Sequence, residues 1–194
     1  MSARGRARIS IGLLALVILV VIVVSWYVRA RNGIVTLDED INGAWAEIDN
    51  QLQRRSDLIP NLVETVRGFA KQEQSIFTDI AEARAKLAGA GSVPEKAESY
   101  NELQGALSRL LVITENYPDL KSNQNFIQLQ DELAGTENRI AVARKRYNDK
   151  VRTYNTRIRR FPGSMMAGSM GFAIRDYFEI DETARQAPKV DFGG

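Results

Sequence analysis

The chain has 194 residues, with 26 Lys and Arg against 24 Asp and Glu, no cysteine and no histidine. It therefore lacks the parts for a Ser-His-Asp triad, a thiol-histidine pair, an ordinary zinc site or a Glu-x-x-His di-iron site. Five arginines in residues 1–31 account for the formal net charge of +2, and the rest of the chain has more acids than bases. This distribution argues against nucleic acid as a partner.

The first predicted element is a membrane span. Residues 9–28 contain no charge and no proline, and a helix of that length covers about 30 Å, the thickness of a bilayer core. Trp26 and Tyr27 stand where an aromatic belt meets the lipid headgroups. Because a cleaved signal peptide has a shorter apolar region, of about 7–15 residues, we expect an uncleaved anchor.

Flanking charges set the expected orientation of this anchor. Three arginines precede it, whereas only Arg29 and Arg31 follow it, and positive charge tends to stay in the cytoplasm. We therefore expect a cytoplasmic N-terminus and a domain on the periplasmic or extracytoplasmic side. The expected parts are the N-terminus (1–8), the anchor (9–28), a helical domain (37–180) and a flexible C-terminal tail (181–194).

Apolar residues after the anchor predict one long helix that ends at Gly89. Two series with a period of seven, typical of a coiled-coil-like seam, are broken only at Arg55 and Glu73. The series are Ile41, Ile48, Leu62, Phe69, Ile76, Ala83 and Trp45, Leu52, Ile59, Val66, Ile80, Leu87.

Pro60 lies inside this run and allows two interpretations. Either one long helix kinks there, or Ser56 and Asp57 cap a new helix with Pro60 in its first turn. The sevenfold phase passes through Pro60 unbroken. Since a reversal loop would rarely preserve phase, we expect the kink.

Two further long helices and one short helix are expected. Ser92 and Glu95 form a capping box that opens the second helix, and Tyr117 and Pro118 end it. An apolar stripe from Phe126 to Phe161 marks the third, which begins near Asn123. A flexible loop over residues 163–171 and a short amphipathic segment over 172–178 follow. The predicted class is all-α: an N-terminal transmembrane helix, then an antiparallel bundle of three long helices and a short C-terminal helix.

Residues 38–49 nearly match a calcium loop. Asp38, Asp40 and Asn42 stand at loop positions 1, 3 and 5, and Asp49 stands at position 12. The last ligand is Asp instead of Glu, and the stretch already belongs to the apolar series of the first helix. We prefer an acidic first helical turn and expect no metal.

Residues 139–160 form a basic stretch with nine Lys and Arg and one acid, Asp149. Such a helix binds anionic lipid or is a solvated face that pairs with the acidic start of the first helix, which we prefer. If the first helix is continuous at Pro60, the basic end is expected far from the membrane; a reversal at Pro60 would return it there.

Three methionines in the 163–171 loop could offer thioether ligands to Cu(I). Met165, Met166 and Met170 have no His or Cys beside them, so we prefer plastic apolar contacts and expect no cofactor.

A group of polar residues is the candidate site. It forms either a docking surface for a partner or a hydrogen-bonded network that fixes helix register, and we prefer the network. Its members are Arg55, Asn61, Glu64, Asn116, Tyr117, Glu137, Asn138, Arg144 and Asn148.

Four stretches carry a resemblance to a known family. They are RRSDLIPNLVETVRGFA (54–70), ENYPDLKSNQNFIQLQDEL (115–133), GTENRIAVARKRYNDKVRTYN (135–155) and the FP…GF…YFE ending (161–179). On these residues the chain resembles the LemA family proteins. The resemblance implies a bacterial, membrane-anchored helical bundle without catalytic residues.

The expected function is that of a non-catalytic scaffold or adaptor of the cell envelope, tethered by one span. An unidentified protein is the expected partner, and a homo-oligomer is a second expectation. The alternative is a metal- or anionic-lipid-responsive sensor that uses residues 38–49 or the basic helix 139–160. An enzyme is the weakest class, because histidine and cysteine are missing.

Overall fold

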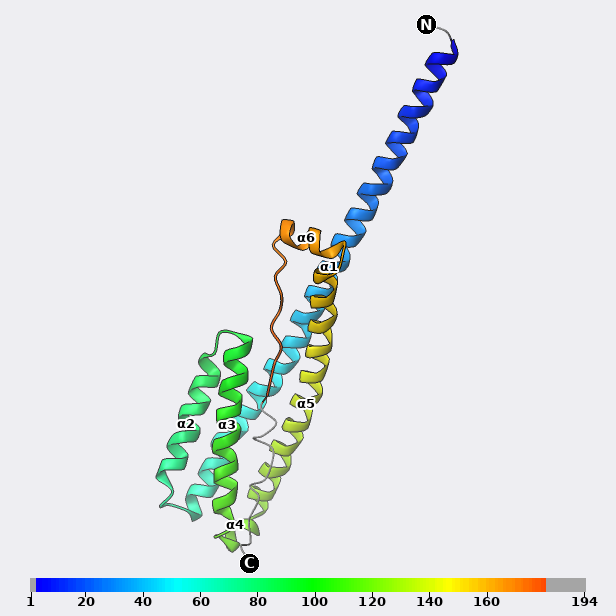
Figure 1. The fold of residues 1–194 in the computed structure, drawn as a ribbon. Coiled ribbons are helices and arrows are strands. Elements are labelled where there is room, and N and C mark those ends of the chain that lie inside the picture. The colour runs from blue at the N-terminus through cyan, green and yellow to red at the C-terminus, as the bar shows by residue number, and fades with distance from the viewer. Residues whose placement is uncertain (1–2, 181–194) are drawn as a thin grey trace, which may run out of the picture. The chain divides into compact units, whose positions relative to one another are not determined.

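The computed structural model describes residues 3–180, and these residues form helices and no strand (Figure 1). The all-α class, with a long apolar N-terminal helix and a helical bundle, is therefore confirmed. The predicted flexible tail, residues 181–194, lies outside the described residues. The helices are α1 (Ala3–Phe69), α2 (Gln74–Gly89), α3 (Val93–Thr114), α4 (Pro118–Lys121), α5 (Gln124–Arg159) and α6 (Gly163–Met170).

The chain divides into two compact units. One comprises Met1–Asn42 with Arg152–Arg175, and we call it the anchor unit. The other comprises Gly43–Val151 with Asp176–Gly194, and we call it the bundle unit. Each unit is described by itself below.

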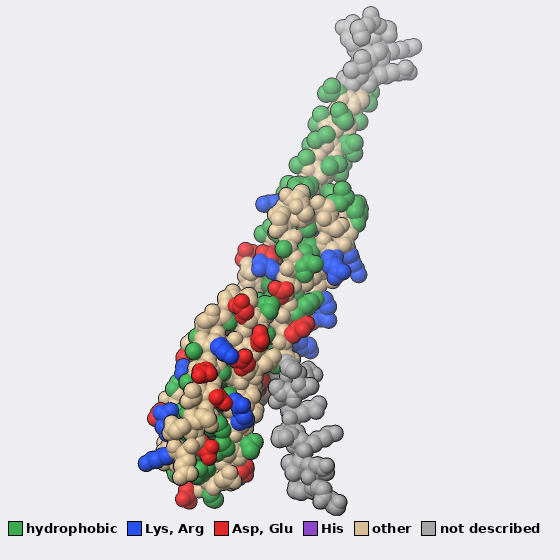
Figure 2. Space-filling model, turned by 60° about the vertical axis from the view of Figure 1, so that its left-hand side comes forward, with side chains coloured by type: hydrophobic (Ala, Val, Ile, Leu, Met, Phe, Trp, Pro, Cys, Tyr) green, Lys and Arg blue, Asp and Glu red, His purple; other side chains and the backbone are tan. Residues whose placement is uncertain are grey.

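One stretch of the described chain is long and apolar enough to cross a membrane. It lies in α1, where an 18-residue window has a mean hydropathy of 2.9 and is 0% buried. Leu13 and Val20 expose 63% and 52% of their surface, and on the face shown in Figure 2 apolar side chains cover this part of the helix. Because water would oppose this much apolar exposure, a lipid environment is the physical explanation.

In the bundle unit, α1 continues through Pro60. The alternative of a new helix capped by Ser56 and Asp57 is therefore wrong. Ile59 and Leu62 on either side of Pro60 are 0% and 1% exposed. Their burial stabilises the helix across the hydrogen bond that proline cannot donate.

The first helix nevertheless ends at Phe69 and not at Gly89. The chain reverses over residues 70–73, where the Glu73 N–H donates to the Ala70 carbonyl at 3.3 Å. Phe69, a predicted seam residue, is 41% exposed, whereas Phe77 is 3% exposed. The seam prediction was wrong here because α2 folds back and packs against α3, with Phe77, Ile80, Ala83 and Leu87 of α2 buried.

Helix boundaries further along follow the predicted signals. Ser92 accepts a hydrogen bond from the Glu95 N–H, and the Glu95 carboxylate accepts one from the Ser92 N–H, so the capping box is confirmed. The Asn123 side chain accepts from the Phe126 N–H at 3.1 Å and caps α5.

The core of the bundle unit is built from one face of each of its longer helices. These buried residues include Ile48, Leu52, Val66, Ile80, Leu87, Leu103, Leu110, Phe126, Ile140 and Val151. In α5 the predicted stripe is buried from Phe126 to Ile158 except at half-buried Leu129, and Phe161 at its end is 79% exposed. The placement of Phe161 in the core was therefore wrong.

In the anchor unit, the predicted flexible loop is the helix α6. Met166 and Ala167 are 5% and 6% exposed, and Gly171 ends the helix with a left-handed φ of 73°. The loop prediction was wrong because burial of these two side chains outweighs the low helix propensity of the glycines. The short C-terminal helix thus lies at 163–170, and residues 172–178 lie outside any helix.

Gly163 is expected to tolerate no side chain. A Cβ there would lie 2.1 Å from the backbone oxygen of Arg157 and 3.1 Å from its carbonyl carbon. Gly163→Ala should therefore destabilise the turn into α6 by about 1–3 kcal/mol, measured as faster amide exchange in α6 of the full-length protein. The matched control is Gly105→Ala, where nothing lies within 4 Å; this change should stabilise α3 by about 0.5–1 kcal/mol. Unchanged exchange in Gly163→Ala would contradict the close approach.

Candidate functional site

The centre of the predicted polar group is a buried ion pair in the bundle unit. Arg55 is 6% exposed, and its Nη1 donates to Glu137 Oε2 at 2.6 Å. The same carboxylate oxygen accepts from Gln104 Nε2 at 2.8 Å and from the Tyr100 hydroxyl. The Arg55 guanidinium lies 5.7 Å from the Tyr100 ring centroid.

This arrangement matches a structural network better than a reactive site. Arg55 also donates to the Gln104 side-chain oxygen, so α1, α3 and α5 each contribute a partner. One oxygen of the Glu137 carboxylate thus accepts from three side chains of the same unit, so it is used for contacts within the protein. The network joins three helices at one register, which is the attested use of buried polar groups.

The other predicted site residues in this unit lie mostly on the surface. Asn61, Asn116 and Asn138 are exposed, and their side chains form no hydrogen bond with another described residue. Glu64 is exposed and accepts from Arg67 at 2.6 Å. Tyr117 precedes α4 and is half-buried, as is Arg144 on α5.

Asn148, the last of the predicted residues, belongs to a second feature that holds the C-terminal segment. Its Nδ2 donates to the Phe178 carbonyl at 3.1 Å, and its Oδ1 accepts from the Phe178 N–H at 2.9 Å. The Phe178 side chain is 0% exposed. Its ring centroid lies 5.7 Å from that of Trp45 and 6.4 Å from that of Tyr100.

This Phe178 socket was missed in the sequence. The Tyr147 hydroxyl donates to the Asp176 carbonyl at 2.9 Å, so two adjacent side chains of α5 bind backbone that has no partner of its own in a helix. The available signal was an aromatic residue in the short amphipathic segment 172–178, together with the neighbouring Tyr147 and Asn148 on the predicted third long helix.

In the anchor unit, Asn and Tyr side chains of α5 likewise form hydrogen bonds with the backbone of residues 173–175. Asn155 Nδ2 donates to the Arg175 carbonyl at 2.8 Å and its Oδ1 accepts from the Arg175 N–H at 3.0 Å. Arg175 Nε and Nη2 donate to the two Asp38 oxygens at 2.9 and 3.0 Å. The Tyr154 hydroxyl donates to the Ala173 carbonyl at 3.0 Å.

These contacts identify the partner of the Asp38 carboxylate. Residues 38–49 are helical and do not form a calcium loop, but α1 begins at Ala3, so the prediction that they form the acidic first turn of a helix was wrong. Asp38 forms a bidentate pair with Arg175, and Asp49 pairs with Lys96. Residues 11–180 contain no group of three or more Asp and Glu placed to hold a metal ion.

Tyr154 gives the anchor unit a pH dependence. Burial and the negative charge of Asp38 raise the pKa of the Tyr154 hydroxyl. Since the folded state keeps this proton longer than the unfolded state, its contribution to stability is full below about pH 10 and is lost as pH rises toward the folded value. NMR titration of 13Cζ-labelled tyrosine, with Tyr154→Phe for assignment, should show this resonance titrating above the ordinary tyrosine value of about 10. A Tyr154 resonance that titrates at or below that value would contradict the prediction.

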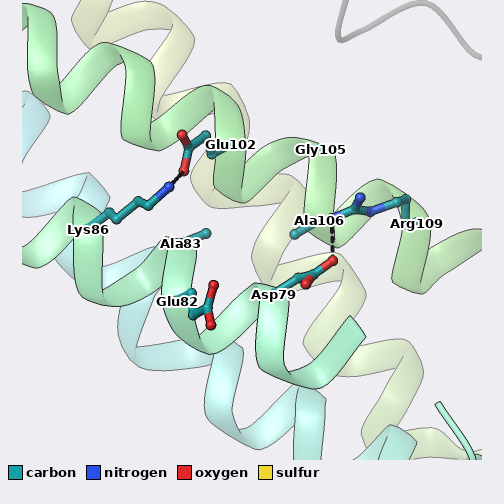
Figure 3. Close-up of a pocket in the computed structure, with 8 residues that line it drawn as sticks. All are labelled: Asp79, Glu82, Ala83, Lys86, Glu102, Gly105, Ala106 and Arg109. Carbon is teal, nitrogen blue, oxygen red and sulfur yellow. Dashed lines mark hydrogen bonds and ion pairs between the residues drawn. The ribbon is translucent and has the colours of Figure 1, made fainter. Parts of the chain in front are cut away.

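A shallow groove runs between α2 and α3, with a volume of about 520 Å³ (Figure 3). Ala83, Gly105 and Ala106 line its floor. Lys86 donates to Glu102 at 2.7 Å, and Arg109 donates to Asp79 at 2.8 Å across it. The hydrogen bond to Glu102 and its charge raise the pKa of Lys86. Both cations of the lining, Lys86 and Arg109, face a carboxylate, and Glu82 adds a third carboxylate, so the groove offers no unpaired positive charge to an anionic substrate.

The basic stretch 139–160 divides between the two units. In the bundle unit, Arg146 pairs with Glu47 at 3.1 Å, as expected for a solvated face beside the first helix. Arg152, Arg157, Arg159 and Arg160 belong to the anchor unit. The expectation that a first helix continuous at Pro60 takes the basic end far from the span was wrong, because the chain reverses at residues 70–73 instead.

The methionines of α6 do not point to one place. Met166 is 5% exposed whereas Met165 is 70% exposed. Consecutive helical residues face different directions, so one sulfur packs inward while its neighbour meets the surroundings. This arrangement matches the apolar-contact interpretation.

The fold and these features define a class: a membrane-associated helical bundle whose buried polar groups serve its own packing. The LemA family model matches residues 44–192, and the chain belongs to the LemA family.

Similar proteins extend this match across most of the chain. Magnetosome protein MamQ 2 of Paramagnetospirillum magneticum is 27% identical over 201 residues, covering 90% of this chain and 74% of that protein. Magnetosome protein MamQ of Magnetospirillum gryphiswaldense is 27% identical over 200 residues with the same coverage. Protein LemA of Metamycoplasma hominis is 23% identical over 163 residues, covering 82% and 73%.

Proposed function

We propose that this protein is a non-catalytic scaffold of the cell envelope, anchored by a single span with its N-terminus in the cytoplasm. The supporting observation is that the predicted site residues fall into two groups, one largely buried and one exposed. Arg55 and Glu137 are used in an internal network, whereas Asn61, Asn116 and Asn138 are exposed without a side-chain hydrogen bond among the described residues. Exposed amides can donate to and accept from a partner with no cost to the fold.

Partner binding through these amides is tested in the full-length protein in its native membrane. A photoreactive residue at Asn61 or Asn116 should give a discrete cross-linked protein, and the same residue at exposed Val112 should not. The alanine triple variant of Asn61, Asn116 and Asn138 should lose partner capture by at least about tenfold with an unchanged melting temperature. Unaltered capture in the triple variant, or a loss explained by unfolding, would refute the docking surface.

The orientation is tested separately with single cysteines, which the cysteine-free chain allows. In intact cells, a cysteine at Val112 should react with a membrane-impermeant maleimide, whereas one at Ser2 should react only after lysis. The reverse pattern would invert the proposed topology.

A further inference from the structure

The second surface of interest is the turn between α5 and α6 in the anchor unit. Arg157, Arg159 and Arg160 are exposed beside Phe161 and Met165, which expose 79% and 70% of their surface; we call these five residues the turn patch. Two large apolar side chains this exposed within one turn of the chain are uncommon on a surface that meets only water. The patch thus needs a partner with an apolar layer.

Charge around the turn patch is of one sign. Residues 152–175 contain five arginines and no Asp or Glu. Arg175 is occupied by Asp38, and the other four lie on α5 or directly after it. A surface with arginines beside apolar side chains complements anionic lipid, in which phosphates lie directly over hydrocarbon.

Contacts within the anchor unit fix the level of the turn patch along α1. Arg175 binds both Asp38 on α1 and Asn155 on α5, so these two residues lie at one level. From there α5 continues for one more turn to Arg159, about 6 Å. Figure 1 shows that this end of α5 runs beside α1 toward its apolar part, and that α6 then turns crosswise to both helices.

The apolar part of α1 ends close to that level. From Asp38 back to Val28 is ten residues, or about 15 Å of helix, so the end of α5 lies within about 9 Å of the last apolar residue. Along α1 from residue 11 onward, Ala30 is the first half-covered residue, and Ile34 is 1% exposed. The headgroup layer is about 5–7 Å thick on each side of the hydrocarbon. On the face shown in Figure 2, Lys and Arg side chains lie near this end of the apolar stretch.

We propose that the turn patch binds the surface of the membrane that the anchor spans. Phe161 and Met165 enter the interfacial layer, and Arg157, Arg159 and Arg160 bind the phosphates of anionic phospholipids. This surface would be a second membrane contact, and it rests on the proposed single span but not on any protein partner.

Single-cysteine labelling of the full-length protein in nanodiscs tests the proposal. A polarity-sensitive fluorophore at Met165→Cys should be blue-shifted and quenched at least about threefold more by shallow spin-labelled lipid than one at Ile174→Cys. Ile174 is the matched control because it is 61% exposed in the same unit, at the level of Asp38. Equal, water-like emission at the two positions would overturn the proposal.

Two further arms separate lipid charge and the span itself. Quenching of a fluorophore at residue 165 should be stronger in nanodiscs that contain phosphatidylglycerol than in phosphatidylcholine alone. The double variant Arg159→Gln with Arg160→Gln should remove that difference. Equal quenching of the parent protein in both lipids would overturn the role of the arginines. A fluorophore at Leu19→Cys should be quenched by deep spin labels. Failure there would refute the proposed span, whereas quenching at 19 without quenching at 165 refutes only the turn patch.

Discussion

Phe178→Ala is expected to destabilise the bundle unit by about 3–5 kcal/mol, because the change empties a fully buried aromatic socket. Phe178 is 0% exposed, and its ring lies 5.7 Å from Trp45 and 6.4 Å from Tyr100. The melting temperature of the full-length protein in detergent should fall by roughly 10 °C. Trp45 fluorescence should shift to the red at temperatures below the main transition, as water reaches the socket.

The neighbouring Tyr177 is the control for this experiment. Tyr177 is 39% exposed, so Tyr177→Ala should alter the free energy of unfolding by no more than about 0.5 kcal/mol. Asn148→Ala should lie between the two variants, because it leaves the Phe178 backbone N–H and carbonyl without their partner. If Phe178→Ala melts like the wild type, the C-terminal segment does not belong to the core.

Arg55→Ala should be the second large effect, at about 3 kcal/mol of lost stability. The change leaves the Glu137 carboxylate in a largely buried position without the guanidinium 2.6 Å away, and breaking one side of a buried pair is far more costly than removing the pair. Chemical denaturation of the full-length protein measures the loss. The double variant Arg55→Met with Glu137→Met should recover most of it.

An exposed ion pair gives the matched comparison. Arg109 and Asp79 pair at 2.8 Å with 60% and 44% of their side chains exposed, so Arg109→Ala should cost less than about 1 kcal/mol. Arg55→Ala could instead lower the free energy of unfolding no more than Arg109→Ala does and still abolish partner capture. That result would assign Arg55 to the docking surface and not to the structural network.

The successful sequence predictions rest on local physics. The capping box of Ser92 and Glu95 involves atoms three residues apart, and the buried stripe of α5 follows from helical periodicity. The apolar run before Arg29 likewise depends only on composition and length. Features of this kind need no knowledge of what packs against the segment.

The predictions that were wrong depend on distant partners. Residues 70–73 contain neither glycine nor proline, so only the fit of Phe77 and its neighbours against α3 decides that the chain reverses there. The glycines of α6 predict a loop by propensity, yet Met166 and Ala167 are buried and the helix forms. Helix propensities differ by under about 1 kcal/mol per residue, whereas burying an apolar side chain contributes about 1.5–3 kcal/mol, so burial outweighs propensity.

The candidate site shows the same division. The sequence by itself determined an apolar span, an all-α domain and a polar group around Arg55 whose two uses stayed open. Only the tertiary structure decided that Arg55 meets Glu137, that Phe178 fills a socket and that the basic end of α5 shares a unit with the span. Helical periodicity specifies which side of a helix is buried, but the pairing of helices depends on side chains that meet across long stretches of chain.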